Sequence, residues 1–444
     1  MKSDLRRPTV EEVLKRAEKD RVKFVDLWFT DILGVTKNIS IPVEFLGKAL
    51  DDGIWFDGSS IEGFGRICES DMYLMPDPST YTLLHWDDPD TRTARLICDV
   101  YSADHRPFEG DPRYVLRRAM KEAEDMGFSY KVGPELEFFL FRRGEGKPEP
   151  EVSDRVGYFD LEGDLALTIR KEMLNVLSLM GIPAEASHHE VSVGQHEIDL
   201  LYGDALEIAD RVVTTRVVVK KVAEKHGLYA TFMPKPVFGI NGSGMHVHQS
   251  LFRGEENAFS DPGDSYGLSK VAYNFLAGQL KYVKEFTAVV APLVNSYKRL
   301  VPGYEAPVYI CWGQMNRSAL IRVPRISKGR GVSTRLELRN PDPSANPYLA
   351  FAVMLRAGLA GIKENLTPDQ PLEDDAYHMI GEGKFDTLPG SLYEALEEMR
   401  KSQLVRKTLG DFLFEKYLAI KMKEWDNYRI QVTRWELDKY LFIY

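Results

Sequence analysis

The sequence contains few cysteines and no long apolar run. Among its 444 residues are only three cysteines, scattered and without a CxxC pair, which argues against a disulfide framework and a structural zinc site. No stretch approaches about 18 consecutive apolar residues, and the amino terminus mixes charges throughout. We therefore expect no membrane-spanning helix and no signal peptide, and predict a cytoplasmic protein without a membrane partner.

Positive charge is also in short supply. The chain has 57 Lys and Arg against 67 Asp and Glu, a net charge of −10, which repels phosphate backbones and disfavours a general nucleic-acid binder. It lacks both the GxxxxGK[ST] and the GxGxxG glycine patterns of common nucleotide-binding folds. Any phosphate that it binds must be met by a local cluster of basic residues.

The composition is that of a folded protein, with 44% hydrophobic and 28% charged residues. Thr9 and Glu12 form a capping-box pattern that predicts a helix near the amino terminus. The segments 22–29 and 35–41 are rich in β-branched and aromatic residues and predict a hairpin. Helix and strands together indicate an α+β fold.

A domain boundary is expected near residue 105. The chain there becomes polar and rich in Pro and Gly, and Asp111 with Pro112 supplies a helix start. We predict a small amino-terminal domain over residues 1–105 and a catalytic domain over residues 106–444.

Charged side chains recur at every second position of three predicted strands, so the members of each set share one face of a sheet. One charged strand alone is usually a solvated surface. Repetition in separate strands with apolar opposite faces instead predicts a concave sheet whose polar face lines a site. The sets are Glu135 and Glu137, His246 and His248, and Arg335, Glu337 and Arg339.

Glu190 and Glu197 have opposite parity, so one straight strand cannot present both to a common site. A hairpin can do so. With Val193 and Gly194 as a two-residue loop, position 190 would lie opposite position 197 and the two carboxylates side by side.

Five carboxylates and an imidazole in one site would repel each other without bound cations. Oxygen-rich ligand sets without thiolates favour Mg²⁺ or Mn²⁺, and two or more ions are expected. Arginines at positions 299, 317, 322 and 339 offer forks for phosphate and carboxylate oxygens. The combination predicts phosphoryl transfer to an acceptor that is itself an acid.

Seven strings of this chain resemble type I glutamine synthetase, in the same order along nearly the whole sequence. They are FDGSS (56–60), GPELEFF (133–139), HHEV with GQHE (188–197), NGSGMHVH (241–248), NSYKRLVPGYEAP (295–307), NRSALIR (316–322) and NPDPSANPY (340–348).

The resemblance implies a small β-grasp-like domain and a large catalytic domain with a curved antiparallel sheet, a half-barrel lined by metal ligands and flanked by helices. It implies ligation of ammonia to L-glutamate through γ-glutamyl phosphate, with ATP as co-substrate and two or three Mg²⁺ or Mn²⁺ ions per site. One metal would be held by Glu137, Glu190 and Glu197, and the other by Glu135, His246 and Glu337.

The resemblance also implies the contacts of the substrates. Phosphate would be contacted by His248, Arg317 and Arg339, and the substrate carboxylate and the transferred phosphoryl group would be contacted by Arg299 and Arg322. Asn241 and Gly242 would contact the glutamate backbone groups, and Tyr158 would lie near the ammonium. The nucleotide would be bound by Tyr202, His248, Ser250 and Arg317.

Four further expectations follow from the resemblance. Asp57 would bind ammonium and remove its proton, although DGSS alone is good turn chemistry. Glu305, in a Pro- and Gly-punctuated loop, would form a flap that excludes water. Because Asp57 lies in the small domain and the family site forms between subunits, a homo-oligomer is implied, a dodecamer of two hexameric rings. Arg66 matches a position linked to glutamine feedback in the shorter, non-adenylylated alpha branch.

Two alternatives stay open at this point. A γ-glutamyl amine ligase would share the fold but would not need Asp57, because its nucleophile is not ammonia. A catalytically silent relative would be expected to lose metal ligands, and none of the six is missing here.

Overall fold

The computed structural model describes residues 8–61, 71–143, 152–161, 163, 166–316, 318–326, 329, 331–373 and 386–444. Arg66 and Arg317, two residues of the predicted site, lie outside the described residues.

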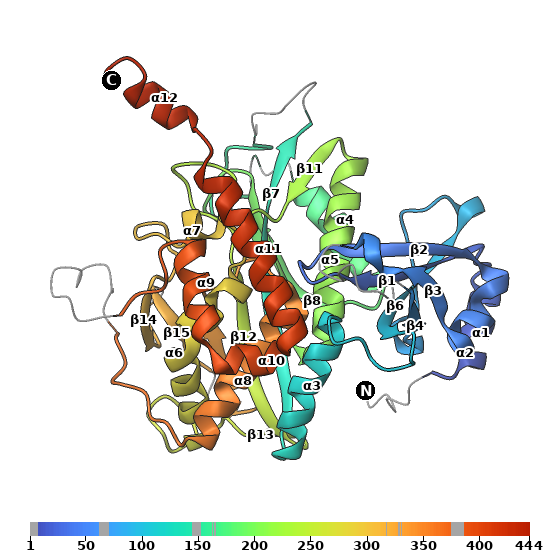
Figure 1. The fold of residues 1–444 in the computed structure, drawn as a ribbon, viewed down its shortest axis with the longest axis horizontal. Coiled ribbons are helices and arrows are strands. Elements are labelled where there is room, and N and C mark those ends of the chain that lie inside the picture. Colours follow the sequence, from blue (N-terminus) through green and yellow to red (C-terminus); the bar gives the residue numbers. More distant parts are fainter. Residues whose placement is uncertain are drawn as a thin grey trace.

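An amino-terminal sheet and two helices form the smaller part of the molecule, at the right of Figure 1. Helix α1 (Val10–Lys19) begins at Thr9, where both bonds of the predicted capping box with Glu12 are present. The predicted hairpin is confirmed. The elements are β1 (Phe24–Thr30), β2 (Thr36–Pro42), α2 (Leu46–Asp52), β3 (Ile54–Asp57), β4 (Asp71–Pro76), β5 (Thr82–Leu83) and β6 (Thr93–Ser102), with the strand order β2-β1-β6-β4-β3 and β5 beside β6.

A larger sheet forms the centre of the remaining chain. Its strands are β7 (Ser129–Arg142), β8 (Ala184–His189), β9 (Gln195–Leu200), β10 (Gly203–Asp204), β11 (Leu228–Thr231), β12 (Met245–Arg253), β13 (Glu256–Asn257), β14 (Tyr309–Gly313), β15 (Ala319–Arg322) and β16 (Leu336–Leu338). The main order is β14-β15-β16-β12-β7-β9-β8, and every pair except the parallel β14–β15 is antiparallel. The long strand β7 lies near the middle, and its apolar positions 136, 138 and 140 are fully buried.

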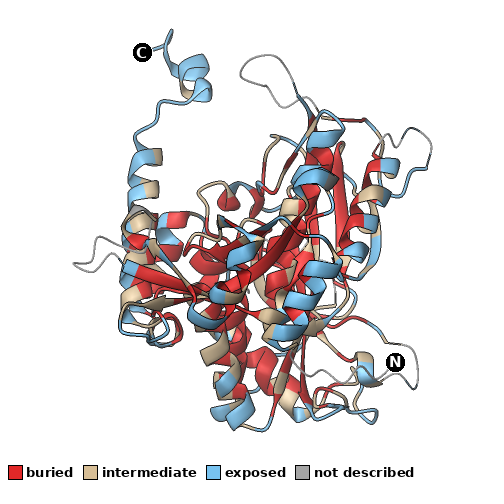
Figure 2. Cartoon of the chain, turned by 90° about the vertical axis from the view of Figure 1, so that its right-hand side faces the viewer, coloured by how far each residue is buried: buried red, intermediate tan, exposed pale blue. Residues whose placement is uncertain are grey.

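Helices pack beside this sheet and against one another (Figure 1). Helix α3 begins at the predicted N-cap, where Asp111 accepts a hydrogen bond from the backbone of Arg113. Figure 2 shows the strands of the larger sheet buried inside the molecule. The helices are α3 (Pro112–Asp125), α4 (Leu167–Leu179), α5 (Ala205–Lys225), α6 (Lys270–Val290), α7 (Ser296–Arg299), α8 (Pro347–Lys363), α9 (Leu392–Lys401), α10 (Gln403–Leu409), α11 (Asp411–Arg429) and α12 (Arg434–Tyr440).

The predicted register of the β8–β9 hairpin is wrong by two residues. His188, not Glu190, lies opposite Glu197, and the backbone of Glu190 instead donates to the carbonyl of Gln195. The turn is longer than two residues because Gly194 takes a left-handed φ of 67° and lies so close to Val152 that a Cβ there would be 3.0 Å from that side chain. A two-residue shift preserves the face of each side chain, so both carboxylates still face the same side.

A buried arginine joins the two parts of the molecule. Arg113 of α3 pairs with Asp77, directly after β4, with Asp99 of β6 and with Asp210 of α5. At the other end, α12 and the apolar residues after it extend away from the body and are largely exposed (Figures 1 and 2). Within the described residues, no helix is both long and apolar enough to cross a bilayer.

Candidate active site

The polar face of the larger sheet lines a cavity of about 450 Å³. Strands β7, β9 and β12 form its floor, and the loops around residues 158, 241 and 305 form its walls. Most of the predicted metal and substrate residues line it, namely Glu135, Glu137, Tyr158, Glu190, Glu197, Asn241, Gly242, His246, Arg299, Glu305, Arg322 and Arg339.

Two histidines hold Glu135 in its ionised form. Its carboxylate lies 3.0 Å from Nδ1 of His246 and 2.7 Å from Nε2 of His248, both on the facing strand β12. Burial alone would raise the pKa of Glu135, but the hydrogen bonds from the two histidines lower it well below its usual range. Burial lowers the pKa of His246 to about 4, so this imidazole is neutral at physiological pH and can act as a ligand.

Three further carboxylates have the opposite tendency. Burial, followed by the nearby charge of Glu190, raises the pKa of Glu137 to about 8, and burial raises that of Glu190 to about 7. Burial and Glu137 raise the pKa of Glu197 well above its usual range. His188 lies between two of them, 3.3 Å from Glu190 and 3.1 Å from Glu197. These carboxylates cannot all ionise at neutral pH unless additional positive charge enters the site.

The side chains of this cavity fit divalent cations. Ligand atoms of Glu135, Glu197 and His246 lie within 4.8 Å of one another, as do those of His188, Glu190 and Glu197. The donor atoms are carboxylate oxygens and imidazole nitrogens without thiolates, a set suited to Mg²⁺ or Mn²⁺. A cation bound there would offset the repulsion that raises the pKa values of the carboxylates.

Glu337 anchors two arginines at the cavity. It is fully buried and accepts hydrogen bonds from Nε of Arg322 and Nη1 of Arg339. Burial raises the pKa of Glu337, but the charges of Arg339, His248 and His246 together outweigh it and lower the pKa to about 2. Nδ1 of His246 lies 3.9 Å from the same carboxylate. Both guanidinium groups are therefore oriented before any substrate arrives.

Arg299 is fixed by backbone carbonyl groups. Its guanidinium donates to the carbonyl oxygens of residues 339, 340 and 341, at 3.0 to 3.2 Å. Gly244 passes so close that a Cβ there would lie 2.5 Å from Nη2 of Arg299. This contact explains why a residue without a side chain precedes the β12 histidines.

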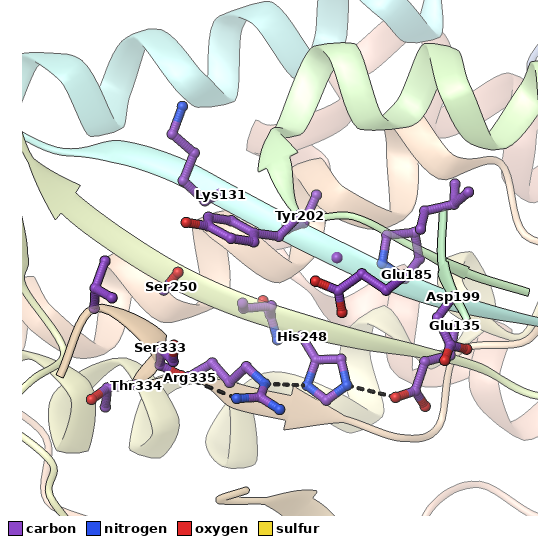
Figure 3. Close-up of a pocket in the computed structure, with 16 residues that line it drawn as sticks. Lys131, Glu135, Glu185, Asp199, Tyr202, His248, Ser250, Ser333, Thr334 and Arg335 are labelled. Carbon is purple, nitrogen blue, oxygen red and sulfur yellow. Dashed lines mark hydrogen bonds and ion pairs between the residues drawn. The ribbon is translucent and has the colours of Figure 1, made fainter. Parts of the chain in front are cut away.

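A second cavity, of about 430 Å³, is shown in Figure 3. It adjoins the first cavity through residues that line both. Glu135 and Asp199 line both cavities. Tyr202 and Ser250, predicted at the nucleotide, lie in the second one, and Nε of Arg335 donates to His248 at 3.2 Å. The two cavities thus share a wall made of acidic side chains from β7 and β9.

Asp199 was missed by the sequence analysis. It lies opposite Glu135 in the β7–β9 pair, and burial raises its pKa. A signal was present, because Asp199 follows Glu197 by two residues and therefore shares its face. His188 and Gln195 were also missed, and Gln195 donates to Glu137 at 2.8 Å.

Glu305 and Asp57 are placed differently from the sheet residues. Glu305 has a left-handed φ of 54°, a conformation that costs about 1 kcal/mol or more for a residue other than glycine, and Asn241 donates to its carboxylate at 3.0 Å. Asp57 is the exposed last residue of strand β3, where hydrogen bonds from Ser59 lower its pKa. It is not among the described residues that line either cavity of this single chain.

The chain matches two family models, described as "Glutamine synthetase, beta-Grasp domain" over residues 21–103 and "Glutamine synthetase, catalytic domain" over residues 109–440. It is 53% identical to a glutamine synthetase of Clostridium saccharobutylicum over 439 residues, covering 98% of both chains. It is 52% identical to glutamine synthetase of Staphylococcus aureus (strain MW2), again covering 98% of both chains.

Two solved structures have a similar fold. One is titled "GmaS/ADP complex-Conformation 1", with a TM-score of 0.88, 32% identity, and coverage of 97% of this chain and 99% of that one. The other is Plasmodium falciparum glutamine synthetase, with a TM-score of 0.89, 26% identity, and coverage of 99% and 100%. Both family models and the full-length relatives show that the chain belongs to the glutamine synthetase family.

Proposed function

We propose that this site joins ammonia to the γ-carboxyl group of L-glutamate with ATP, through γ-glutamyl phosphate. The observation that carries the proposal is the acidic wall shared by the two cavities at Glu135 and Asp199. Glutamate and ammonium would occupy the cavity lined by Arg299 and Glu305, and the nucleotide the cavity lined by Tyr202 and Ser250. Phosphoryl donor and acceptor would then meet at the cation ligands.

We propose the metal ligands in two sets. Glu137, Glu190 and Glu197 would hold one divalent cation, and Glu135, His246 and Glu337 the other. Bound cations would neutralise the negative charge of the transferring phosphoryl group and polarise its oxygens. This assignment is supported by the raised pKa values of the first three carboxylates, a repulsion that bound cations would relieve.

The arginines would stabilise charge that develops on the phosphoryl group. Arg322 and Arg339 are held toward the cavity by Glu337, so they need little reorganisation when substrate binds. Arg299 would bind the substrate carboxylate. Asn241 and Gly242 would contact the glutamate backbone groups, and His248 and Arg317 the phosphates of the nucleotide.

The nucleophile requires a base outside this cavity. Ammonium has no free electron pair, so a carboxylate must bind the cation and take one proton. Asp57 would do this at the site of a neighbouring subunit, with Tyr158 beside the ammonium. We accordingly propose a homo-oligomer, a dodecamer of two hexameric rings, in which the domain of residues 1–105 completes the adjacent catalytic domain of residues 106–444.

Glu305 would close the site. A flap that excludes water would protect the acyl phosphate from hydrolysis, and the hydrogen bond that Asn241 donates to Glu305 supports this role. We place the chain in the shorter alpha branch of the family, without adenylylation. In that branch Arg66 would mediate inhibition by glutamine, which Arg66→Ala should relieve.

One assay tests the proposed reaction. The purified protein is given ATP, Mg²⁺ and glutamate, with ammonia or with methylamine or ethylamine as acceptor, and the amide product and phosphate are both quantified. We expect glutamine and phosphate in a one-to-one ratio and faster turnover with ammonia. Faster turnover with an amine would favour a γ-glutamyl amine ligase instead.

A further inference from the structure

The turn between β8 and β9 contains Glu190, and a buried carboxylate from another part of the chain contacts this turn. Asp154 is 6% exposed and belongs to the described segment 152–161. One of its oxygens, Oδ1, accepts a hydrogen bond from the backbone N–H of Gly194 at 2.9 Å and lies 3.0 Å from Nε2 of His189. Asp154 therefore contacts the residue at each end of the turn.

His189 connects Asp154 to the backbone of Glu190. Its Nδ1 lies 2.6 Å from the carbonyl oxygen of Glu190, and its side chain is completely buried. The carbonyl oxygen of Glu190 and the ionised carboxylate of Asp154 can only accept, so the doubly protonated ring donates from Nδ1 to Glu190 and from Nε2 to Asp154. The ring is thereby held between Asp154 on one side and the main chain of Glu190 on the other.

A second contact links the same two segments. The backbone N–H of Phe159 donates to the carbonyl of His189 at 3.3 Å, and the rings of Tyr158 and Phe159 meet the ring of His188 edge to face. The segment with Asp154 therefore also carries Tyr158, which lines the first cavity.

Asp154, His189 and His196 are close enough to suggest a metal site of their own, because their ligand atoms lie within 4.8 Å of one another. The proton positions argue against that reading. Nη1 of Arg170 lies 2.9 Å from Nδ1 of His196, and arginine can only donate, so Nδ1 is the acceptor and Nε2 carries the proton. A protonated nitrogen cannot bind a cation. It faces Oδ2 of Asp154 at 3.8 Å instead.

We propose that Asp154 is a positioning residue that sets the place of Glu190 by holding both ends of the β8–β9 turn, directly at Gly194 and through His189 at Glu190. This inference rests on the proposed function, because it takes Glu190 as a metal ligand. Groups that orient metal ligands typically change metal affinity by about 10- to 100-fold when they are removed.

The test is Mn²⁺ binding to the full-length protein, followed by the electron paramagnetic resonance signal of free Mn²⁺, with no substrate present. Asp154→Ala should weaken one class of sites by about tenfold or more and change the other class by less than about twofold. Asp154→Asn keeps an oxygen at the Oδ1 position and should restore part of the lost affinity. His189→Leu, of similar volume but without ring nitrogens, should reproduce the effect of Asp154→Ala. It replaces Asp154→Ala in the test if Asp154→Ala does not fold.

A double-mutant cycle with Glu190→Gln separates positioning from general stability. If Asp154 acts through Glu190, Asp154→Ala has no further effect on Mn²⁺ affinity in the Glu190→Gln background. Asp111→Ala is the matched control, because Asp111 is 2% exposed, caps α3 and lines neither cavity. It should lower thermal stability without a change in either class of sites.

The outcomes distinguish the two proposals. Equal weakening of both classes by Asp154→Ala, or a further loss in the Glu190→Gln background, would overturn the positioning role. Unchanged Mn²⁺ binding in Asp154→Ala would overturn it as well and leave the proposed reaction intact. Failure of the unaltered protein to bind Mn²⁺ would instead contradict the proposed metal site itself.

Discussion

Glu137→Gln should stabilise the metal-free protein and at the same time remove much of its response to divalent cations. One oxygen of Glu137, Oε2, accepts two hydrogen bonds, from the backbone of Gly244 at 3.0 Å and from Gln195 at 2.8 Å. A glutamine can keep both bonds with its amide oxygen. What it loses is the ability to ionise and to offer a carboxylate to a cation.

The size of the stabilisation follows from the pKa of Glu137, which burial and Glu190 raise from 4.5 to about 8. Between these values the folded protein holds a proton that the unfolded chain has released, so folding stability falls as the pH rises. Each pH unit corresponds to about 1.4 kcal/mol. Keeping this group protonated in the folded, metal-free protein thus costs about 4 kcal/mol at pH 7.5 and about 1 kcal/mol at pH 5.5, and glutamine avoids this cost.

Thermal melts in EDTA at pH 5.5 and pH 7.5 measure the effect. The midpoint of Glu137→Gln should exceed that of the unaltered protein by several degrees more at pH 7.5 than at pH 5.5. Saturating Mn²⁺ should raise the midpoint of the unaltered protein strongly and that of the variant weakly. Glu255→Gln, at an exposed hairpin turn, is the control and should change neither.

Identical pH dependence of the midpoint in Glu137→Gln and the unaltered protein would refute the assignment of Glu137 as a buried, proton-holding carboxylate. Full stabilisation of the variant by Mn²⁺ would refute its role as a ligand.

Two further predictions concern protons and the flap. Mn²⁺ binding at pH 7 should release protons, because burial raises the pKa of Glu137 to about 8 and that of Glu190 to about 7, whereas both bind a cation as carboxylates. Proton release should diminish above pH 8.5. Calorimetry of Mn²⁺ binding in buffers of different ionisation enthalpy measures the release, and heats that did not depend on the buffer would contradict it. Glu305→Ala should leave ATP binding intact but release more phosphate than glutamine, since the contact with Asn241 at 3.0 Å is lost; a one-to-one ratio in this variant would argue against the flap.

Local patterns predicted the elements of this protein well. The capping box at Thr9, the N-cap at Asp111 and the alternation of Glu135 with Glu137 each depend on a few neighbouring residues, and the structure contains all three features. The same alternation predicted that carboxylates and histidines share a face, because strand periodicity is independent of what lies around the strand.

Features set by distant segments could not be predicted in this way. The β8–β9 turn is longer than expected because Asp154 and Val152, some forty residues earlier in the chain, contact Gly194. Pairing of Arg322 with Glu337 depends on the β15–β16 register, which no local pattern specifies. The position of Asp199 two residues after Glu197 predicts the face on which it lies, but not that it lies opposite Glu135 on the neighbouring strand β7.

The most direct test of the proposed chemistry follows oxygen atoms. Glutamate labelled with ¹⁸O in its γ-carboxyl group is incubated with the protein, ATP, ammonia and Mg²⁺, and the phosphate formed is analysed by mass spectrometry. If γ-glutamyl phosphate forms and ammonia displaces its phosphate, each phosphate should carry one ¹⁸O from the substrate. Unlabelled phosphate released together with glutamine would contradict the transfer of the phosphoryl group to glutamate in this site.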